Sequence, residues 1–244
     1  MSLTQSICHL LRRATGLSPP QHHSNPIFSP TSLSQLIAMK VATLLAAIVG
    51  VASAAPGQLV SKRALTPQDI NPRTGCPGYL TPGEFEFPHY ITQISKSQPD
   101  KAYGPQYFGV FTPNDVSSIF SFDIPASRTG ANCTLEFFFP TQSQLKTSSY
   151  TYSGAGSFFF TGYNPGSCPN AETTYNNQPK PGPFPPFPPV HMEPGNAYII
   201  DIGPCWVGAG TCVAGMTSTN DTNFSFFQDS DECPIGIYTS YSYL

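Results

Sequence analysis

Apolar and polar residues alternate with a period of two along most of the chain after residue 84. In 119–124 (IFSFDI), phenylalanine and isoleucine alternate with serine and aspartate, and 134–139 (TLEFFF) follows the same rule. Because successive side chains of a strand point to opposite faces, each segment predicts a strand with one buried and one solvated face. Helical periodicity is nearly absent from the same region.

Seven further segments carry shorter versions of this pattern. Turn signals separate them, such as 164–166 (NPG) and 194–196 (PGN). Pro88 has no N–H to donate, which confines its strand to a sheet edge or a strand start. Many short strands with little helix predict an all-β, antiparallel sandwich or barrel of about nine strands. The seven segments are 85–91, 150–153, 157–162, 197–202, 211–214, 224–228 and 235–241.

Two polar or proline-rich segments do not fit the strand pattern. Residues 64–85 contain glycine, proline and polar residues and predict a linker, which places the β domain at 86–244. Residues 179–189 (PKPGPFPPFPP) carry seven prolines, so they favour polyproline II and cannot pair inside a sheet. One interpretation is a recognition arm anchored by Phe184 and Phe187. The favoured one is a stiff loop between two strands.

An apolar leader lies upstream of the β pattern, at residues 39–54 (MKVATLLAAIVGVASA). One lysine, a short apolar run and a small-x-small ending at Ala54 are typical of a secretory signal peptide. The run is shorter than the roughly 20 residues that span a bilayer. We therefore expect cleavage after Ala54 and export of the rest.

The residues on either side of this leader predict further processing. Residues 1–38 are rich in proline and serine and are expected to be an unstructured extension, with translation starting at Met39 and a transit peptide as the alternative. Residues 55–63 end in Lys62-Arg63, which predicts a propeptide cleaved after Arg63; an ordinary surface charge pair is the alternative. The mature chain would begin at Ala64.

The charge of that mature chain argues against two classes of partner. Five of the eleven Lys and Arg precede Ala64 and all fourteen Asp and Glu follow it, so the mature charge is 6 − 14 = −8. Nucleic-acid binding requires lysine and arginine to neutralise phosphates, so the sequence predicts no nucleic acid. Anionic membranes are disfavoured for the same reason, and no lipid-anchor signal follows the last strand segment.

Cysteine number agrees with an oxidising compartment. Cys8 lies in the extension, and an even number of cysteines remains, which predicts up to three disulfides with 15 possible connectivities. No C-x-x-C occurs and only two histidines remain after the leader, so zinc is not expected. The six candidate disulfide cysteines are Cys76, Cys133, Cys168, Cys205, Cys212 and Cys233.

Three N-x-S/T sequons predict N-glycosylation at Asn132, Asn220 and Asn223. Their position downstream of the leader adds to the case for export and places these residues at the surface. Asn220 and Asn223 are too close in sequence for both to carry a glycan reliably.

Several stretches together resemble a known family. They include 87–91 (FPHYI), 102–107 (AYGPQY), 120–125 (FSFDIP), 133–140 (CTLEFFFP) and 149–156 (SYTYSGAG). They continue with 173–177 (TTYNN), 194–198 (PGNAY), 227–229 (FQD) and 234–238 (PIGIY). In this order and spacing they resemble the fungal secreted proteins that carry a ubiquitin-3-binding-protein But-two C-terminal domain. The proline-rich run and the insert around 205–212 depart from that pattern.

The resemblance implies a β-sandwich and a fungal, surface-associated setting, without catalytic residues to carry over. The family name also implies a partner in a ubiquitin-like pathway. That pathway is cytosolic and nuclear, whereas this chain carries a leader, sequons and paired cysteines.

Enzymatic alternatives have candidates but no complete motif. A glycosidase needs two carboxylates across a cleft. Asp123 and Glu136 lie on the polar phase of their strands, so we expect both to be solvated. A serine triad lacks a G-x-S-x-G elbow, and a copper oxygenase lacks an N-terminal histidine after either cleavage. The candidate carboxylates are Glu84, Glu86, Asp123, Glu136, Asp201 and Asp229.

Other polar groups have structural interpretations that we prefer to functional ones. His89 lies in phase with apolar neighbours and is expected to be a buried, hydrogen-bonded histidine rather than a metal ligand; His191 is the other histidine. The run 229–232 (DSDE) offers oxygen ligands for Ca²⁺ but lacks a calcium-loop glycine, so a solvated acidic loop is expected. No cofactor is predicted.

Aromatic residues are abundant, with 18 Phe and 12 Tyr. Exposed tyrosines can stack on sugar rings or anchor a protein, although packing at the rim is the favoured interpretation. Trp206 is expected to pack on the disulfide of Cys205. The candidate tyrosines are Tyr150, Tyr152, Tyr163, Tyr175, Tyr241 and Tyr243.

Taken together, the sequence predicts a secreted, non-enzymatic module of the cell wall or extracellular space. This module would bind polysaccharide or protein. The alternatives are a hydrolase with a carboxylate pair and an adaptor in a ubiquitin-like pathway.

Overall fold

The computed structural model describes residues 61–62, 75–183 and 188–243, all within the second of two units of the chain, Ser53–Leu244. Several sequence predictions lie outside the described residues: the extension, the signal peptide, Cys8, and the cleavage positions Ala54 and Arg63. Phe184 and Phe187, the suggested anchors of the proline-rich run, also lie outside them.

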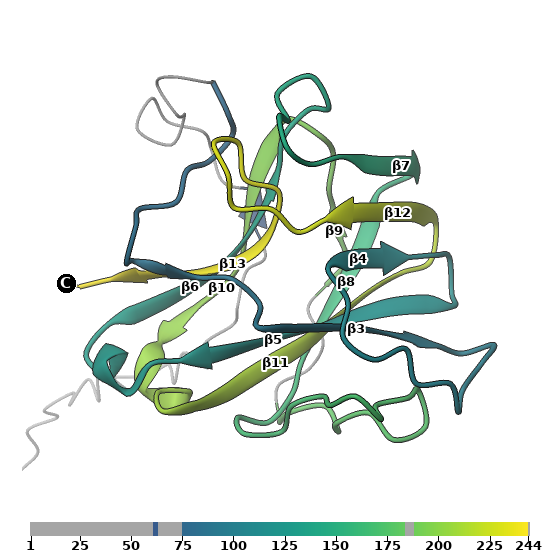
Figure 1. The fold of residues 1–244 in the computed structure, drawn as a ribbon, viewed down its shortest axis with the longest axis horizontal. Coiled ribbons are helices and arrows are strands. Elements are labelled where there is room, and N and C mark those ends of the chain that lie inside the picture. The colour runs from purple at the N-terminus through teal and green to yellow at the C-terminus, as the bar shows by residue number, and fades with distance from the viewer. Residues whose placement is uncertain (1–60, 63–74, 184–187, 244) are drawn as a thin grey trace, which may run out of the picture. The chain divides into compact units, whose positions relative to one another are not determined.

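The described residues form thirteen strands in three sheets, and every strand pairing is antiparallel (Figure 1). Sheet A has the order β1 (Ser61–Lys62), β10 (Asn196–Pro204), β6 (Asn132–Phe139), β13 (Gly236–Ser242), β2 (Phe85–Glu86). Sheet B has the order β3 (Tyr90–Ser95), β5 (Val116–Ile124), β11 (Thr211–Thr219), β8 (Ser157–Gly162), β9 (Val190–His191). Sheet C has the order β4 (Phe108–Phe111), β12 (Thr222–Phe227), β7 (Tyr150–Gly154).

This architecture confirms the all-β, antiparallel sandwich, and each of the nine predicted segments contains a strand. The first predicted segment, 85–91, is divided at Pro88 into β2 and β3, which belong to different sheets. Each of the two is an edge strand, as predicted for this segment, although Pro88 itself lies between them. The sequence pattern did not predict β1, β4 and β9. Two 3₁₀ turns, η1 (Ala126–Arg128) and η2 (Cys205–Val207), complete the elements.

Aromatic side chains from all three sheets fill one shared core. Phe224 of β12 lies at its centre, with its ring centroid 4.8 Å from that of Phe139 in sheet A and 5.7 Å from that of Phe158 in sheet B. Phe120 of β5 stacks on Phe226, with an interplanar angle of 7°. Because the rings interlock across sheets, the sheets bury one another's apolar faces.

The outer face of sheet B is also covered, which corrects one prediction. Ile119 packs with Tyr163 and Ala214 in a second apolar cluster, beneath the loop that follows β8. Ser121 shares the face of Ile119 and is buried rather than solvated. Asp123, at the end of the strand, remains exposed as predicted.

The proline-rich run lies between β8 and β9, in keeping with the favoured interpretation of a loop. Its described part starts against β8: Gly182 N donates to Gly162 O at 2.8 Å, and Pro181 forms an isolated bridge with Tyr163. The described residues contain no helix that is long and apolar enough to cross a bilayer.

All six predicted cysteines are paired, as Cys76–Cys233, Cys133–Cys205 and Cys168–Cys212. The second disulfide joins β6 to η2, and the third joins the loop after β8 to β11. Each therefore fixes a connecting segment to a strand or to another connection of the sandwich.

Residues 75–86, which we call the cover segment, cross the outer face of sheet A and end in its edge strand β2. The sequence predicts a linker over 64–85, but the described part of that range is packed: Cys76 is fully buried and Leu80 contacts the cluster of Phe138 and Tyr238. Gly78 lies so close to the Phe138 ring that an added Cβ would be 2.6 Å from it. Short polar stretches with glycine and proline have the composition of linkers. The packing of this one on sheet A becomes evident only from the long-range disulfide Cys76–Cys233.

Candidate functional site

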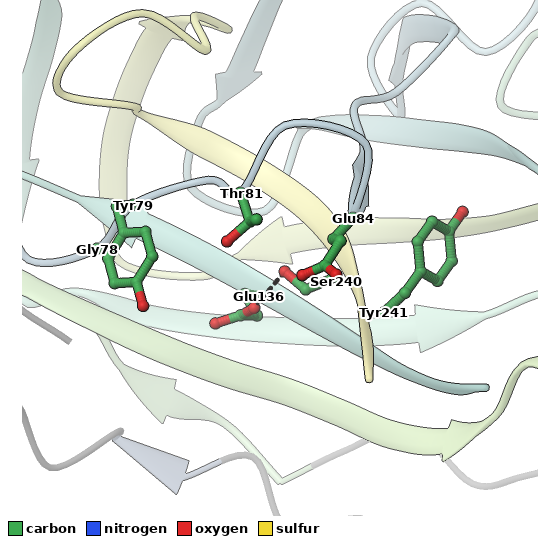
Figure 2. A pocket seen from close by; sticks show the side chains of 7 residues that line it. All are labelled: Gly78, Tyr79, Thr81, Glu84, Glu136, Ser240 and Tyr241. Carbon is green, nitrogen blue, oxygen red and sulfur yellow. Dashed lines mark hydrogen bonds between the residues drawn. The ribbon is translucent and has the colours of Figure 1, made fainter. Parts of the chain in front are cut away.

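A polar pocket of about 150 Å³ lies between the cover segment and the outer face of sheet A (Figure 2). Strands β6 and β13 form its floor, and the cover segment forms its walls. The floor and walls thus come from parts of the chain more than 50 residues apart. Its lining residues are Gly78, Tyr79, Thr81, Glu84, Glu136, Ser240 and Tyr241.

Glu136 lies at the floor of the pocket, with only 4% of its surface exposed. It sits in the middle of β6, opposite Ile199 of β10 and Tyr238 of β13. Ser240 donates its Oγ–H to Glu136 Oε1 at 2.6 Å, a short hydrogen bond. The prediction that Glu136 is solvated is therefore wrong, because the cover segment buries the polar face of β6.

Glu84 and Tyr79 form the wall and the mouth of the pocket. Glu84 is exposed, and its backbone is fixed from both sides: its N–H donates to Thr81 O at 3.0 Å, and Tyr241 N donates to its carbonyl at 2.9 Å. In Figure 2 the carboxylates of Glu84 and Glu136 both lie beside Ser240. The ring of Tyr79 is 49% exposed at the mouth.

Arg128 of η1 joins the cover segment to the end of β13. Its guanidinium donates to the Tyr243 hydroxyl at 3.1 Å and to Gly83 O, and it lies 4.5 Å from the ring centroid of Tyr241. Burial raises the pKa of the Tyr241 phenol, and the Glu86 carboxylate raises it further, against the opposing charge of Arg128. The phenol therefore stays neutral over the whole physiological range.

His89 lies beside this site, between two carboxylates from different sheets. Its Nδ1 is 2.9 Å from Asp123 Oδ2 of β5, and its Nε2 is 3.4 Å from Glu86 Oε2 of β2. Phe87 packs edge-on against the imidazole, at 5.3 Å between ring centroids. The side chain is 38% exposed, so the expectation of a buried histidine is wrong, although the expected hydrogen-bond partner is present.

The remaining candidate carboxylates do not join the pocket lining. Asp229 accepts a hydrogen bond from Thr147 Oγ1 at 2.5 Å and another from Asp231 N at 3.1 Å, within the acidic run. Asp201 follows a register shift in the pairing of β10 with β6. His191 is 3.8 Å from Glu193. In the described ranges no group of three His, Cys, Asp or Glu side chains is arranged to hold a metal ion.

Most of the exposed aromatic side chains are not among the candidate tyrosines predicted from the sequence. Tyr163 and Tyr241 are buried, and Tyr150, Tyr152 and Tyr175 are half-buried, so Tyr243 is the nominated residue that is exposed. Trp206 is 64% exposed, which contradicts the expected packing on the disulfide. No periodicity distinguishes the exposed positions, because most of them lie in turns and connections and Phe108 begins the short strand β4. The exposed rings are Tyr79, Phe87, Tyr107, Phe108, Trp206 and Tyr243.

Of the predicted glycosylation sites, Asn220 and Asn223 are exposed and Asn132 is half-buried at the start of β6. Asn220 lies in the connection between β11 and β12, and Asn223 lies on β12 itself. Attachment of a glycan at any of these three stays a prediction.

Comparison with known proteins identifies one family. The family model described as "Ubiquitin 3 binding protein But2 C-terminal domain" matches residues 86–232, more than half of the chain. No curated protein matches the chain at a significant level.

Proposed function

Starting from the fact that this chain belongs to the family with a ubiquitin 3 binding protein But2 C-terminal domain, we propose that it is an exported, non-enzymatic binding module of the cell wall or extracellular medium. The single observation that carries this proposal is the pairing of all six cysteines after the leader. Structural disulfides form and persist in oxidising compartments and are rare in the cytosol. The acidic mature surface and the sequons support the same setting.

The binding role rests on the pocket between the cover segment and sheet A. Carboxylate and hydroxyl oxygens of Glu84, Thr81 and Ser240 can accept hydrogen bonds from sugar hydroxyls, and the exposed face of Tyr79 can stack on a sugar ring. The volume of about 150 Å³ is below the roughly 300–1,000 Å³ of sites that enclose a drug-sized ligand. The pocket therefore suits one sugar unit, or the end of a polysaccharide chain.

Retention of purified protein on insoluble wall glucan and chitin tests this role. Loss of a stacking ring removes about 0.5–1.5 kcal/mol, so Tyr79→Ala should weaken retention severalfold. Tyr107→Ala removes a ring that is more exposed than that of Tyr79 but does not line the pocket, and it should leave retention unchanged. Equal retention of wild type and Tyr79→Ala, or no retention of wild type, would refute polysaccharide binding at this pocket.

A hydrolase is the second candidate, favoured by the two carboxylates in one pocket. Glu84 is exposed and Glu136 is buried against Ser240, so their environments differ in the way that acid–base pairs require. The small volume weighs against it, because a polysaccharide cleft must admit several sugar units. Release of reducing sugar by wild type, abolished in Glu136→Gln, would establish the hydrolase and overturn the non-enzymatic proposal.

An adaptor in a ubiquitin-like pathway is the alternative that the family name suggests. It requires a cytosolic protein with free thiols and empty sequons. Mass spectrometry of the native product, before and after reduction and deglycosylation, separates the two: export predicts alkylation of six cysteines only after reduction, and a mass that falls on deglycosylation.

A further inference from the structure

The outer edge of sheet A is covered by a very short strand. β10 pairs with β6 through eight residue pairs, but on its other side it pairs with β1 through only two, Ser61 with Ile199 and Lys62 with Tyr198. β1 is the edge strand of sheet A, and without it β10 becomes the edge. β1 lies outside the residues that the family model matches.

β1 contains the first half of the dibasic motif. Lys62 is its second residue, and the bond after Arg63 follows directly. While the chain is continuous, the tether keeps β1 at a high effective concentration beside β10. Cleavage after Arg63 removes the tether, and two residue pairs do not offset the translational and rotational freedom that a separate peptide would lose on binding.

The edge that cleavage exposes is apolar at one end. Ile202 of β10 is exposed, and it is followed by the exposed side chains of Trp206 and Val207 in η2. Unpaired strand edges accept another strand, and proteins normally protect them with charges, prolines or a covering segment. Here the covering segment is β1, and Pro204 ends the strand on the side of η2.

We propose that β1 is a removable edge strand, and that its release by cleavage after Arg63 lets two copies of the chain pair through their β10 edges. A twofold axis places the same stretch of both copies side by side in antiparallel orientation, which is the orientation in which β10 already accepts β1. Around a twofold axis near residue 201, Ile202 of one copy lies diagonally across the strand pair from Ile202 of the other, so this exposed isoleucine gains an apolar partner. This goes beyond the proposed function, since it requires no polysaccharide.

The oligomeric state before and after cleavage tests the proposal. The purified chain is treated in vitro with a dibasic-specific endoprotease, and its molar mass is measured by light scattering across a concentration series. The cleaved chain should reach twice the monomer mass, while the uncleaved chain stays monomeric. Arg63→Ala keeps β1 attached and should remain monomeric after the same treatment.

A pair of matched variants locates the interface. Ile202→Lys places a charge on the edge and should keep the cleaved chain monomeric, whereas Tyr107→Lys, an equally drastic change at an exposed position beside sheet C, should dimerise like wild type. Circular dichroism confirms that both are folded. In wild type, amide exchange of residues 198–203 should slow as the concentration of cleaved protein rises.

Three results would overturn the proposal: a cleaved chain that stays monomeric, an uncleaved chain that dimerises equally, or a cleaved propeptide that native mass spectrometry finds still bound. None of them bears on retention by glucan or chitin, so this inference and the proposed function fail separately.

Discussion

At the scale of single residues, the buried polar side chains connect segments that are distant in the sequence. Glu136 is buried under the cover segment, where Ser240 donates a hydrogen bond to its carboxyl group. Ser118 lies in the interior of β5, where its hydroxyl donates to Val110 O at 2.9 Å and accepts from Val110 N at 2.8 Å, tying sheet B to sheet C. Both of these buried polar side chains are thus hydrogen-bonded across an interface between segments.

Gly78→Ala is expected to destabilise the protein by about 1–3 kcal/mol, as overpacking of a well-filled site does. The added methyl group would meet the Phe138 ring, which is itself held in a buried cluster. Gly130→Ala is the control, since its Cβ would meet nothing within 4 Å. Thermal unfolding of the two variants decides; equal melting temperatures would mean that the cover segment does not lie against Phe138.

The hydrogen bonds to Asp115 make the stability of the folded protein depend on pH. Its carboxylate accepts hydrogen bonds from Ser97 N at 2.9 Å, Ser95 Oγ at 2.7 Å and Ser97 Oγ at 2.8 Å. These bonds, that from the Ser97 backbone first, lower the pKa of Asp115 below 3.8. A lowered folded-state pKa means that this contribution to stability is complete well above the ordinary pKa and is lost as the pH falls through the lowered value.

Asp115→Asn should therefore cost stability at pH 7 and progressively less towards pH 3. The cost stays below the roughly 1.5–3 kcal/mol of hydrogen bonds to charged groups, because solvent screens a carboxylate that is only partly covered. Glu172→Gln, at an exposed carboxylate in the loop after β8, is the control for the loss of one carboxylate. Melting temperatures across this pH range are the measurement, and a difference between Asp115→Asn and wild type that is independent of pH would contradict the prediction.

At the scale of elements, the sequence predicts strands well and covering segments poorly. Alternation located the long strands because one face of each packs into the aromatic core. It missed β4, whose four residues FGVF are interrupted by Gly109, where an added Cβ would lie 2.5 Å from the Phe226 ring. It also missed β1 and β9, since two residues carry no period.

The pocket could not be predicted from the same pattern, although two of its carboxylates were candidates. Local sequence places Glu136 on the polar face of β6, and nothing local shows that residues 75–86 fold back over that face. The contact depends on Cys76–Cys233, whose cysteines are 157 residues apart. The sequence allows 15 disulfide pairings, and the correct one had to be known before Glu84 and Glu136 could be placed in the same pocket.

Removing the Cys76–Cys233 disulfide should loosen the cover segment before the sandwich. In a Cys76→Ser/Cys233→Ser variant we expect a loss of about 2–5 kcal/mol, and faster amide exchange in residues 75–86 than in β5 or β11. Cys168→Ser/Cys212→Ser is the matched control, because it opens a loop of 44 residues on sheet B and should leave exchange in the cover segment unchanged. Similar exchange profiles in the two variants would show that this disulfide does not hold the pocket.

At the scale of the whole molecule, one aromatic core makes the three sheets a single cooperative unit. Phe224 of sheet C contacts rings from sheets A and B, so no sheet can lose its packing alone. Phe227, on the opposite face of the same strand, packs instead against the exposed ring of Phe108.

Phe224→Ala is expected to destabilise the protein by about 3–5 kcal/mol while unfolding remains a single transition, seen at the same midpoint by near- and far-ultraviolet circular dichroism. Phe227→Ala should cost much less. Two separate midpoints in wild type or in Phe224→Ala would show instead that the sheets unfold independently.

The position of β13 in sheet A has a consequence for biosynthesis. This strand is the last of the described strands to leave the ribosome, yet it lies between β6 and β2. Cys233, which fixes the cover segment through its disulfide, lies three residues before it. The strands of sheets B and C can pair during translation, but sheet A stays incomplete between β6 and β2 until β13 has been synthesised. A stop codon before residue 236 would remove Ile237 and Tyr241 from the core and leave their neighbours exposed, so such a product should be degraded.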